Sequence, residues 1–478
     1  MNNQDQHPSG LLPSYITSAT PNPMDKRAPW YKTTAQTYGG IFLWFVFWDS
    51  MSGNGLSSGG LGAALAGVVI GALICHFLFY IVPGTLGMST GLPLYVVGTS
   101  TFGAVGGLLM PGFLMGALQF GWLGVNAWGA SEALSRGFGA PGLYVPLCIV
   151  WTLLAAFVGL KGIQYVAKVA TYLPLIPFVV LMMGLVMFAG SAGNYKPAPD
   201  VTAAVTGASS GGGFKAMLLM ISAIVGFFAT AGAAGVDICS SNRDKRDVSM
   251  GGIFGIVIAI IFTAGISIIA VAGAKAAGII DPSVTKMTVA LQQKLAPGLF
   301  AALMIALTIA AFPSACFSSF IAANSFKTTL PKVSPFISVG IGAIVSILIA
   351  VLPFGAAPDQ KWAAILPSVF GLIGASFGPI VGAMVVDYLL SGKQWAGPRA
   401  GFNPAGWIAW LLGFSVGILP NQILPASIRL DVPCAPVAAF VVGAVAYFVC
   451  AKLGMQTQVI PLPAKTAAPA TAAPAPAK

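Results

Sequence analysis

The chain has 478 residues, of which 57% are apolar and only 7% are Asp, Glu, Lys or Arg. Soluble domains carry about a quarter charged residues because their surfaces face water. This composition excludes an ordinary water-soluble domain and predicts a surface in contact with lipid. The formal net charge of +11 comes from basic residues scattered among predicted loops, so it indicates membrane topology. A nucleic-acid surface would need clustered basic residues.

Apolar stretches recur along the chain, and a helix needs about 20 such residues to cross a bilayer. Stretches such as 252–274 lack the alternation over about 10 residues that is typical of membrane barrels. We therefore predict an all-α polytopic membrane protein. A cytoplasmic segment 1–37 precedes a transmembrane domain 38–453, and a disordered Pro- and Ala-rich cytoplasmic tail 454–478 follows it. Twelve spans are predicted, near residues 38–62, 63–85, 101–131, 142–160, 168–190, 215–240, 250–279, 298–326, 334–354, 364–391, 405–420 and 434–452.

The loops assigned to the cytoplasm hold most of the 23 Lys and Arg residues when the N-terminus is placed inside. This bias follows the positive-inside rule and predicts a protein of the inner (plasma) membrane with both termini in the cytoplasm. The first 35 residues lack the short apolar core of a signal peptide. We expect the first span to act as the insertion signal.

Two predicted spans are rich in glycine. The first contains Ser52-Gly53-Asn54-Gly55, followed by Ser57-Ser58-Gly59-Gly60, and the sixth runs from Gly226 to Gly235 and contains three glycines. Glycine weakens a helix and frees backbone groups to act as ligands, and two interrupted helices five spans apart are typical of inverted-repeat transporters. The alternative is that small residues only allow close helix packing. For the paired pattern, we favour the site.

Acidic residues inside a membrane are costly and usually functional. Asp49 lies just before the glycines of the first span, where it could bind a proton, a cation or a polar substrate edge, or make a structural hydrogen bond. Asp237 precedes the basic Arg243, which favours an intracellular salt bridge or gate. Asp387 lies at a predicted cytoplasmic end, where an interfacial anchor is expected.

Trp122 lies in the middle of the third span, away from the interfaces where Trp is usually enriched. Flat heteroaromatic solutes stack on such rings, and Asn126 is one turn away on the same helix face. A single buried Trp more often serves packing. The combination of Trp122, Asn126 and neighbouring glycines favours a binding site.

Three stretches carry a family resemblance: from Met88-Ser-Thr-Gly-Leu to Gly121-Trp122-Leu-Gly-Val, from Val225-Gly-Phe-Phe-Ala-Thr-Ala-Gly to Val236-Asp237, and from Gly378-Pro-Ile-Val-Gly to Asp387-Tyr. In this order and spacing the chain resembles the nucleobase–cation symporter family, the purine/cytosine permease group, over roughly residues 38–450. The resemblance implies ten helices in two inverted five-helix repeats, with helices 1 and 6 broken, plus two further helices. It places the substrate between helices 1 and 6 on one side and helices 3 and 8 on the other.

The resemblance also implies site residues. Trp122 and Phe228 would hold a planar ring between them, with Phe227 beside Phe228. Polar ring atoms would be read by side chains and backbone groups of the broken helices and of helix 8. These residues are Asn126, Ser314, Gly53, Asn54 and Gly226.

The coupling site is where the sequence departs from the family. The hydroxyl pair that binds sodium in the family aligns with Ala311 and Phe312. A shifted register offers Ser318 and Ser319 instead, and Asp49 is the alternative as a proton carrier. The coupling ion is therefore H⁺ or Na⁺.

The function predicted from these features is cation-coupled uptake of a nucleobase or related heterocycle by alternating access. An amino-acid or other small-metabolite permease of the same fold is the alternative, and a membrane-embedded enzyme a remote one. No span carries a paired-carboxylate, His-rich or Ser/Lys constellation for catalysis, and the only histidines are His7 and His76. We expect no cofactor, no metal site, no nucleic acid and no obligatory protein partner; the small-molecule substrate and the lipid bilayer are the expected partners.

Overall fold

A computed structural model describes residues 12–161, 166, 170, 172–197, 212–351 and 358–462. Over these ranges the regular structure is helical, and the only β contacts are two isolated bridges. Nine helices are long and apolar enough to span a membrane, and Pro335–Val351 and Pro404–Ile418 are two shorter apolar helices. With the helix that precedes Gly60, the described residues account for the twelve predicted spans. The predicted all-α class is confirmed.

The described helices follow one another with short connections, and several contain a single π-helical turn. The longer ones are α2 (Thr34–Leu43), α3 (Phe45–Ile74), α4 (Ile81–Thr90), α7 (Leu114–Gly137), α8 (Tyr144–Lys161), α10 (Leu175–Phe188), α12 (Gly212–Ala233), α14 (Lys245–Gly252), α15 (Ala259–Ala276), α16 (Met287–Lys294), α17 (Pro297–Thr329), α18 (Pro335–Val351), α19 (Pro358–Leu390), α20 (Pro404–Ile418) and α21 (Ala435–Lys452). The short ones are α1 (Ser14–Thr17), α5 (Leu94–Val97), α6 (Thr99–Phe102) and α13 (Gly235–Cys239).

The first two predicted spans are joined in α3. The chain turns at Gly60, whose φ of 83° is in the left-handed region that glycine adopts without a Cβ clash. Beyond this turn α3 continues through a π-helical stretch, Cys75–Tyr80, into α4. A non-helical residue inside an otherwise continuous helix therefore separates the first span from the second.

Small residues bring α3 and α12 into close contact. A Cβ at Gly59 would lie 2.4 Å from Ala216 Cβ, and one at Gly67 would lie 2.7 Å from Met220 Cβ. In lipid, helices are not held together by a hydrophobic driving force, so they associate through close packing at small residues such as these. The glycines of the first and second spans thus hold α3 against α12.

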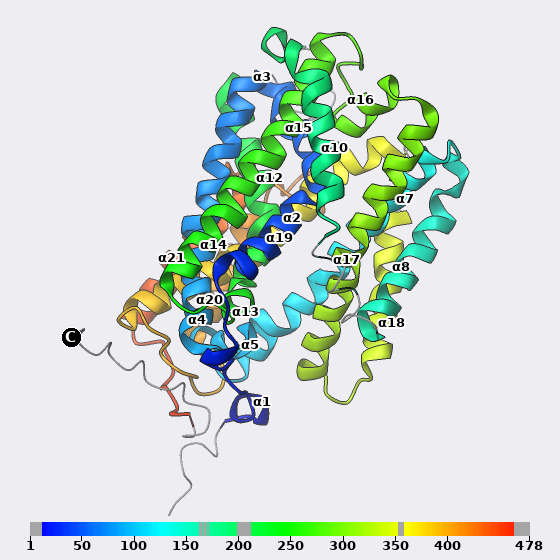
Figure 1. The fold of residues 1–478 in the computed structure, drawn as a ribbon. Helices are drawn as coiled ribbons and strands as arrows, with labels where there is room; N and C mark the ends of the chain where they lie inside the picture. The colour runs from blue at the N-terminus through cyan, green and yellow to red at the C-terminus, as the bar shows by residue number, and fades with distance from the viewer. Residues whose placement is uncertain are drawn as a thin grey trace, which may run out of the picture.

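The two ends of the helical bundle differ (Figure 1). One end carries α1, α5 and the end of the described C-terminal segment, and we refer to it as the termini side; α16 lies at the opposite end, the α16 side. On the termini side, the Asn22 amide donates to Gly91 O at 2.9 Å and the Ala28 amide to Ser241 O at 2.9 Å. The segment before α2 therefore ties together loops that follow α4 and α13.

The beginning of the expected tail is packed against the fold. Within 454–462, the Ile460 amide donates to Pro398 O at 2.7 Å, and Gln458 O accepts from the Ala400 amide at 3.0 Å. Ile460 is buried. Residues 463–478, the rest of the expected tail, lie outside the described residues.

Candidate functional site

An aromatic cluster lies where α7 meets α12 and α19. The Trp122 ring on α7 lies 4.9 Å from the Phe227 ring at 79°, and 5.9 Å from the Phe370 ring. Trp122 Nε1 donates to Thr230 Oγ1 at 3.2 Å. A fourth ring, that of Trp44, lies 6.3 Å from Trp122. Trp122 and Phe227 were predicted from the sequence as site residues, whereas Trp44 and Phe370 were not.

Phe228 points away from Trp122. Its ring is fully buried, 5.7 Å from Tyr38 and 6.0 Å from Phe42. Successive residues of an α-helix point about 100° apart, so only one of two adjacent phenylalanines can face α7. In this structure that residue is Phe227, and Phe228 instead packs α12 against α2.

Asn126 belongs to a directed chain of hydrogen bonds. Trp151 Nε1 donates to Asn126 Oδ1 at 3.4 Å, Asn126 Nδ2 donates to Ser314 Oγ at 2.6 Å, and Ser314 Oγ donates to Ala311 O at 2.7 Å. An indole N–H can only donate and a carbonyl can only accept, so the two ends fix the direction of the whole chain. The structure thus brings Asn126 and Ser314 together, as predicted, and adds Trp151 of α8.

The first span departs from helical geometry at two residues. Residues 45–59 are helical, so Ser52-Gly53-Asn54-Gly55 does not interrupt the span; Gly60, the last of the glycines expected to weaken it, is non-helical, and so is Trp44, with ψ of 120° between α2 and α3. Trp48 Nε1 donates to Leu43 O at 3.0 Å, which satisfies a carbonyl that the break leaves without its helical partner. Inside lipid, such a group needs a partner of this kind.

The glycines assigned to the site serve close packing in this structure. A Cβ at Gly53 would lie 3.2 Å from Thr285 Cβ, and one at Gly226 would lie 2.6 Å from Phe370 O. The sixth span is interrupted at Ala234, between α12 and α13, which is at the end of the predicted segment. The side chain of Asn54 lies outside the described residues.

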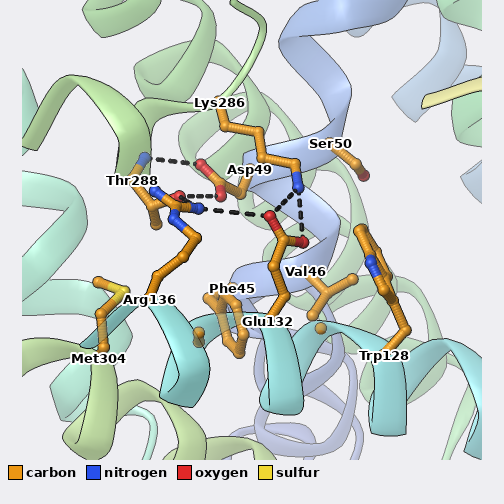
Figure 2. A pocket seen from close by; sticks show the side chains of 12 residues that line it. Phe45, Val46, Asp49, Ser50, Trp128, Glu132, Arg136, Lys286, Thr288 and Met304 are labelled. Atoms are coloured by element: carbon orange, nitrogen blue, oxygen red, sulfur yellow. Dashed lines mark hydrogen bonds and ion pairs between the residues drawn. The ribbon is translucent and has the colours of Figure 1, made fainter. Parts of the chain in front are cut away.

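Asp49 lies in a charged cluster on the α16 side (Figure 2). Its carboxylate accepts from the Thr288 amide at 2.9 Å and from Thr288 Oγ1. Beside it, Lys286 Nζ donates to both oxygens of Glu132, at 2.6 and 2.7 Å, and Arg136 lies 3.4 Å from the same carboxylate. Because Lys286 and Thr288 belong to the start of α16, these bonds join α16 to both α3 and α7.

Ser318 and Ser319 do not reach this cluster. Their hydroxyls donate to the helix's own carbonyls, Ser314 O at 3.1 Å and Ala315 O at 3.4 Å. Ser319 faces α8, because a Cβ at Gly159 would lie 2.9 Å from Ser319 Cβ. The predicted coupling residues are therefore divided between two places. In the described part of the chain, no group of three His, Cys, Asp or Glu side chains could hold a metal ion.

Asp237 and Arg243, predicted to form a salt bridge or a gate, have different partners in this structure. Asp237 Oδ1 accepts from the Leu94 amide at 2.9 Å, which ties α13 to the start of α5. Arg243 Nε instead lies 2.7 Å from Asp247 Oδ2. Arg243 lies just before α14 (Lys245–Gly252) and Asp247 in its first turn, and the Arg243 guanidinium also donates to Asp247 Oδ1 at 3.1 Å, so Asp247 is its partner.

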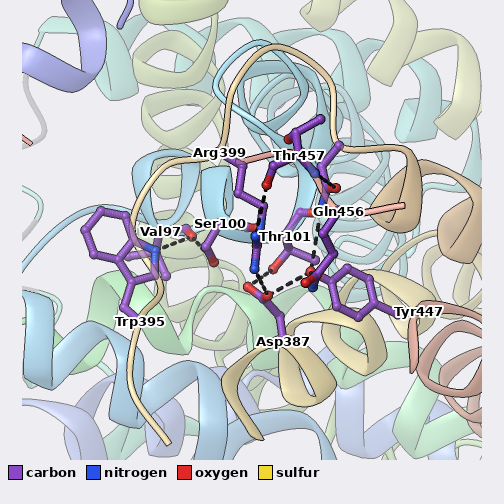
Figure 3. Close-up of polar contacts among 10 residues, drawn as sticks. Val97, Ser100, Thr101, Asp387, Trp395, Arg399, Tyr447, Gln456 and Thr457 are labelled. Atoms are coloured by element: carbon purple, nitrogen blue, oxygen red, sulfur yellow. Dashed lines mark hydrogen bonds and ion pairs between the residues drawn. The ribbon is translucent and has the colours of Figure 1, made fainter. Parts of the chain in front are cut away.

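Asp387 is buried and is not an interfacial anchor (Figure 3). Its carboxylate lies 3.2 Å from Arg399 Nη2 and accepts from Tyr447 Oη at 2.7 Å. Arg399 also donates to Ser100 O at 2.8 Å and to Thr457 O at 3.0 Å. This network joins α19, α21, the end of α6 and the C-terminal segment.

Several residues of these sites could not be found from sequence patterns. Trp44 and Trp151 had no glycine or charge beside them that marked them out. Lys286 counted only as one of the basic loop residues, and Thr288 had no signal at all. Their roles depend on contacts between segments far apart in the sequence.

The comparison with known families gives a match over most of the chain: the family described as permease for cytosine/purines, uracil, thiamine, allantoin matches residues 26–449. The chain belongs to this permease family. No curated protein sequence matches it significantly. The permease is thus a multi-pass membrane transporter and not an enzyme.

Solved structures share the fold of the permease. The inward-facing conformation of Mhp1 aligns with 93% of this chain and 96% of its own, at 17% identity and a TM-score of 0.63. A closed conformation of Mhp1, described as a nucleobase-cation-symport-1 family transporter with bromovinylhydantoin bound, gives 16% identity and a TM-score of 0.60, with the same coverage. A Na⁺-coupled sialic acid symporter aligns with 91% of this chain and 92% of its own, at 15% identity and a TM-score of 0.53. The expected fold of two inverted repeats is confirmed.

Proposed function

We propose that the permease carries a planar heterocycle of the nucleobase type across the membrane, coupled to a cation and by alternating access. The observation that carries the proposal is the aromatic cluster of Trp122, Phe227 and Phe370 beside the polar chain through Asn126. Aromatic faces favour flat rings, and a few placed polar groups fix their orientation. An Mhp1 structure of the same fold holds bromovinylhydantoin, which supports a heterocyclic solute.

The proposed binding residues are those of the cluster and its polar neighbours. Trp122 and Phe227 would contact the faces of the ring, and Asn126 with Ser314 would read its edge. Opening the space between the rings requires Trp122 and Phe227, now in edge contact, to move apart. Phe228, Gly226, Gly53 and Asn54 stay predictions of the sequence; of these, Phe228 and Gly226 adjoin the cluster through α12.

Alternating access needs closable contacts at both ends of the site. The Asp49–Thr288 and Glu132–Lys286 bonds close the α16 side, and the Asp237–Leu94 bond closes the termini side. We assign the termini side to the cytoplasm, from the distribution of Lys and Arg, and place the protein in the inner (plasma) membrane. Asp237 then belongs to an inner gate; for Arg243, which pairs with Asp247, a gating role stays a prediction of the sequence.

For the coupling ion we propose the carboxylate of Asp49 as the binding group. It lies on α3, five residues after the break at Trp44, and its oxygens are already held by Thr288. The hydroxyls of Ser318 and Ser319 bond to carbonyls of their own helix, α17, and not to α3. This argues against a sodium site formed by these two serines together with α3. A proton therefore fits Asp49 better than sodium, since sodium wants several oxygen ligands.

Ligand-dependent thermal stability of the purified permease tests the proposal. The panel is cytosine, uracil, adenine, allantoin, thiamine and a set of amino acids, each with and without sodium and at two pH values. A ligand that binds the native state at 100 times its Kd stabilises it by about 2.7 kcal/mol. We expect one heterocycle to raise the melting temperature; a shift with an amino acid only would refute the heterocycle and leave the fold.

Trp122→Ala is the matching variant. We expect it to abolish both the stabilisation and the uptake of that heterocycle. Trp410→Ala serves as the control, because Trp410 stacks on Phe414 of the same helix, α20, and bonds to Ser376 O. Binding of the heterocycle to Trp122→Ala with unchanged affinity would remove Trp122 from the site.

A further inference from the structure

Trp44 has an unusual position in the first span. It is the non-helical residue between α2 and α3, yet its side chain is turned inward and only 8% exposed. Its ring lies 6.3 Å from Trp122 at 69° and 6.3 Å from Phe227 at 33°. The break in the helix therefore adds a fourth ring to the aromatic cluster of Trp122, Phe227 and Phe370.

The indole N–H of Trp44 is buried and has no hydrogen-bond partner among the residues that the structure describes. Neighbouring indoles are satisfied: Trp122 donates to Thr230, Trp48 to Leu43 O and Trp151 to Asn126. A buried donor without a partner destabilises the native state, and such groups are rare in native proteins. Trp44 is thus an unpaired hydrogen-bond donor beside Trp122, where the proposed solute would bind.

We propose that the Trp44 N–H is a specificity determinant that donates a hydrogen bond to an acceptor on the edge of the solute. The acceptor is a carbonyl oxygen or an unprotonated ring nitrogen, because an indole N–H cannot accept. The inference rests on the proposed function and deepens it: the solute is a heterocycle with an acceptor at the edge facing the break of the first span. A ring of the same shape with C–H at that position leaves the donor unsatisfied.

The selectivity comes from the unpaired N–H of Trp44. This group is already out of contact with water in the solute-free protein, so a solute with an acceptor gains a hydrogen bond without a further desolvation penalty on the Trp44 N–H, whereas a solute without an acceptor gains none. Sites that hydrogen-bond a substrate discriminate strongly against analogues lacking the group, for this reason. A single neutral hydrogen bond of about 1.4 kcal/mol corresponds to a tenfold difference in Kd.

The test uses the full-length permease and the heterocycle that the thermal panel identifies. Trp44→Phe keeps an aromatic ring and removes the N–H, and Trp407→Phe is the matched control. Trp407 of α20 is also a buried indole without a partner in the described structure, and it lies beside Gly106 and Phe402 instead of the cluster. We expect the Kd to rise about tenfold or more in Trp44→Phe and to stay unchanged in Trp407→Phe.

Analogues of the same heterocycle separate a binding role from a packing role. In each analogue one carbonyl or ring nitrogen is replaced by C–H. We expect one analogue to bind the wild type about tenfold more weakly and to be insensitive to Trp44→Phe, since the lost bond is the same. If every analogue loses affinity equally in wild type and variant, Trp44 acts only through packing and the inference is wrong.

Three further outcomes are decisive. Should Trp44→Phe not fold, benzothienylalanine at position 44 replaces only the N–H by sulfur and keeps the bicyclic shape; an unchanged Kd with it overturns the inference. If a heterocycle binds the wild type and both Trp44 variants equally, the inference fails and the proposed function stands. If no heterocycle binds the wild type, the proposed function fails first.

Discussion

Removing the carboxylate of Asp387 is expected to destabilise the termini side of the fold. In Asp387→Leu, the Arg399 guanidinium loses its ion pair at 3.2 Å and Tyr447 loses an acceptor at 2.7 Å. The side chains of Arg399 and Asp387 are only 10% and 3% exposed, so water cannot replace the missing partner. Breaking a buried pair by removing one member costs about 3–5 kcal/mol.

We place Asp387→Leu near the lower end, at about 3 kcal/mol, because Arg399 keeps its bonds to Ser100 O and Thr457 O. Arg399→Met should cost a similar amount, since it leaves Asp387 buried and charged. The double variant should cost no more than either single one, because it leaves no unpaired charge. Additive loss, about 6 kcal/mol for the double variant, would refute the reasoning.

The assay is equilibrium unfolding of the three variants in mixed micelles with increasing dodecyl sulfate. Asp387→Asn is the control for charge alone, because it preserves the shape and can still accept from Tyr447 Oη. We expect it to fall between the wild type and Asp387→Leu. A destabilisation by Asp387→Asn equal to that by Asp387→Leu would assign the whole effect to the charge.

Two further predictions concern other contacts. Gly342→Ala places a Cβ 1.8 Å from Phe120 Cε1, whereas the Cβ of Gly340→Ala on the same helix meets nothing within 4 Å. We expect only Gly342→Ala to destabilise the protein, by about 1–3 kcal/mol. Equal melting curves for the two variants would contradict the packing of α18 on α7. Lys286→Met removes the ion pair that holds α16 to Glu132 of α7, so spin labels on α16 and at the end of α7 should report a larger population of long distances. Lys294→Met, at the exposed end of α16, should leave that distance distribution unchanged. If Lys286→Met also leaves it unchanged, the Lys286–Glu132 ion pair is not one of the contacts that close the α16 side.

The fold could be predicted from the sequence because it depends on local composition. Apolar stretches of sufficient length define spans wherever they occur, and the order of short motifs indicated the family that residues 26–449 match. The glycines predicted the non-helical residue Gly60, but the break at Trp44 could not be predicted in this way. Glycines at 53 and 55 do not interrupt the helix, because in lipid the helical hydrogen bonds persist unless another group replaces them. That replacement exists at Trp44, through Trp48 and Leu43 O.

The part of the site that depends on local sequence spacing could be predicted in the same way as the fold. Trp122 and Asn126 share a helix face by spacing alone, so their proximity needed no tertiary information. Choosing between Phe227 and Phe228 depends on how α12 is rotated, which only its packing against α3 and α19 decides. The partner of Asp49, Thr288, lies 239 positions away, beyond the reach of any local pattern.

The Arg399–Thr457 bond also affects the order in which the protein can be completed during synthesis. Thr457 lies 58 positions after Arg399, and chains grow at about 5–20 residues per second. For roughly 3–12 s, a nascent permease therefore holds the Arg399 guanidinium with one of its final acceptors still missing. The guanidinium thus gains its full set of acceptors only after the segment that follows α21 has been synthesised, so a chain interrupted before Thr457 would lack this contact with the C-terminal segment.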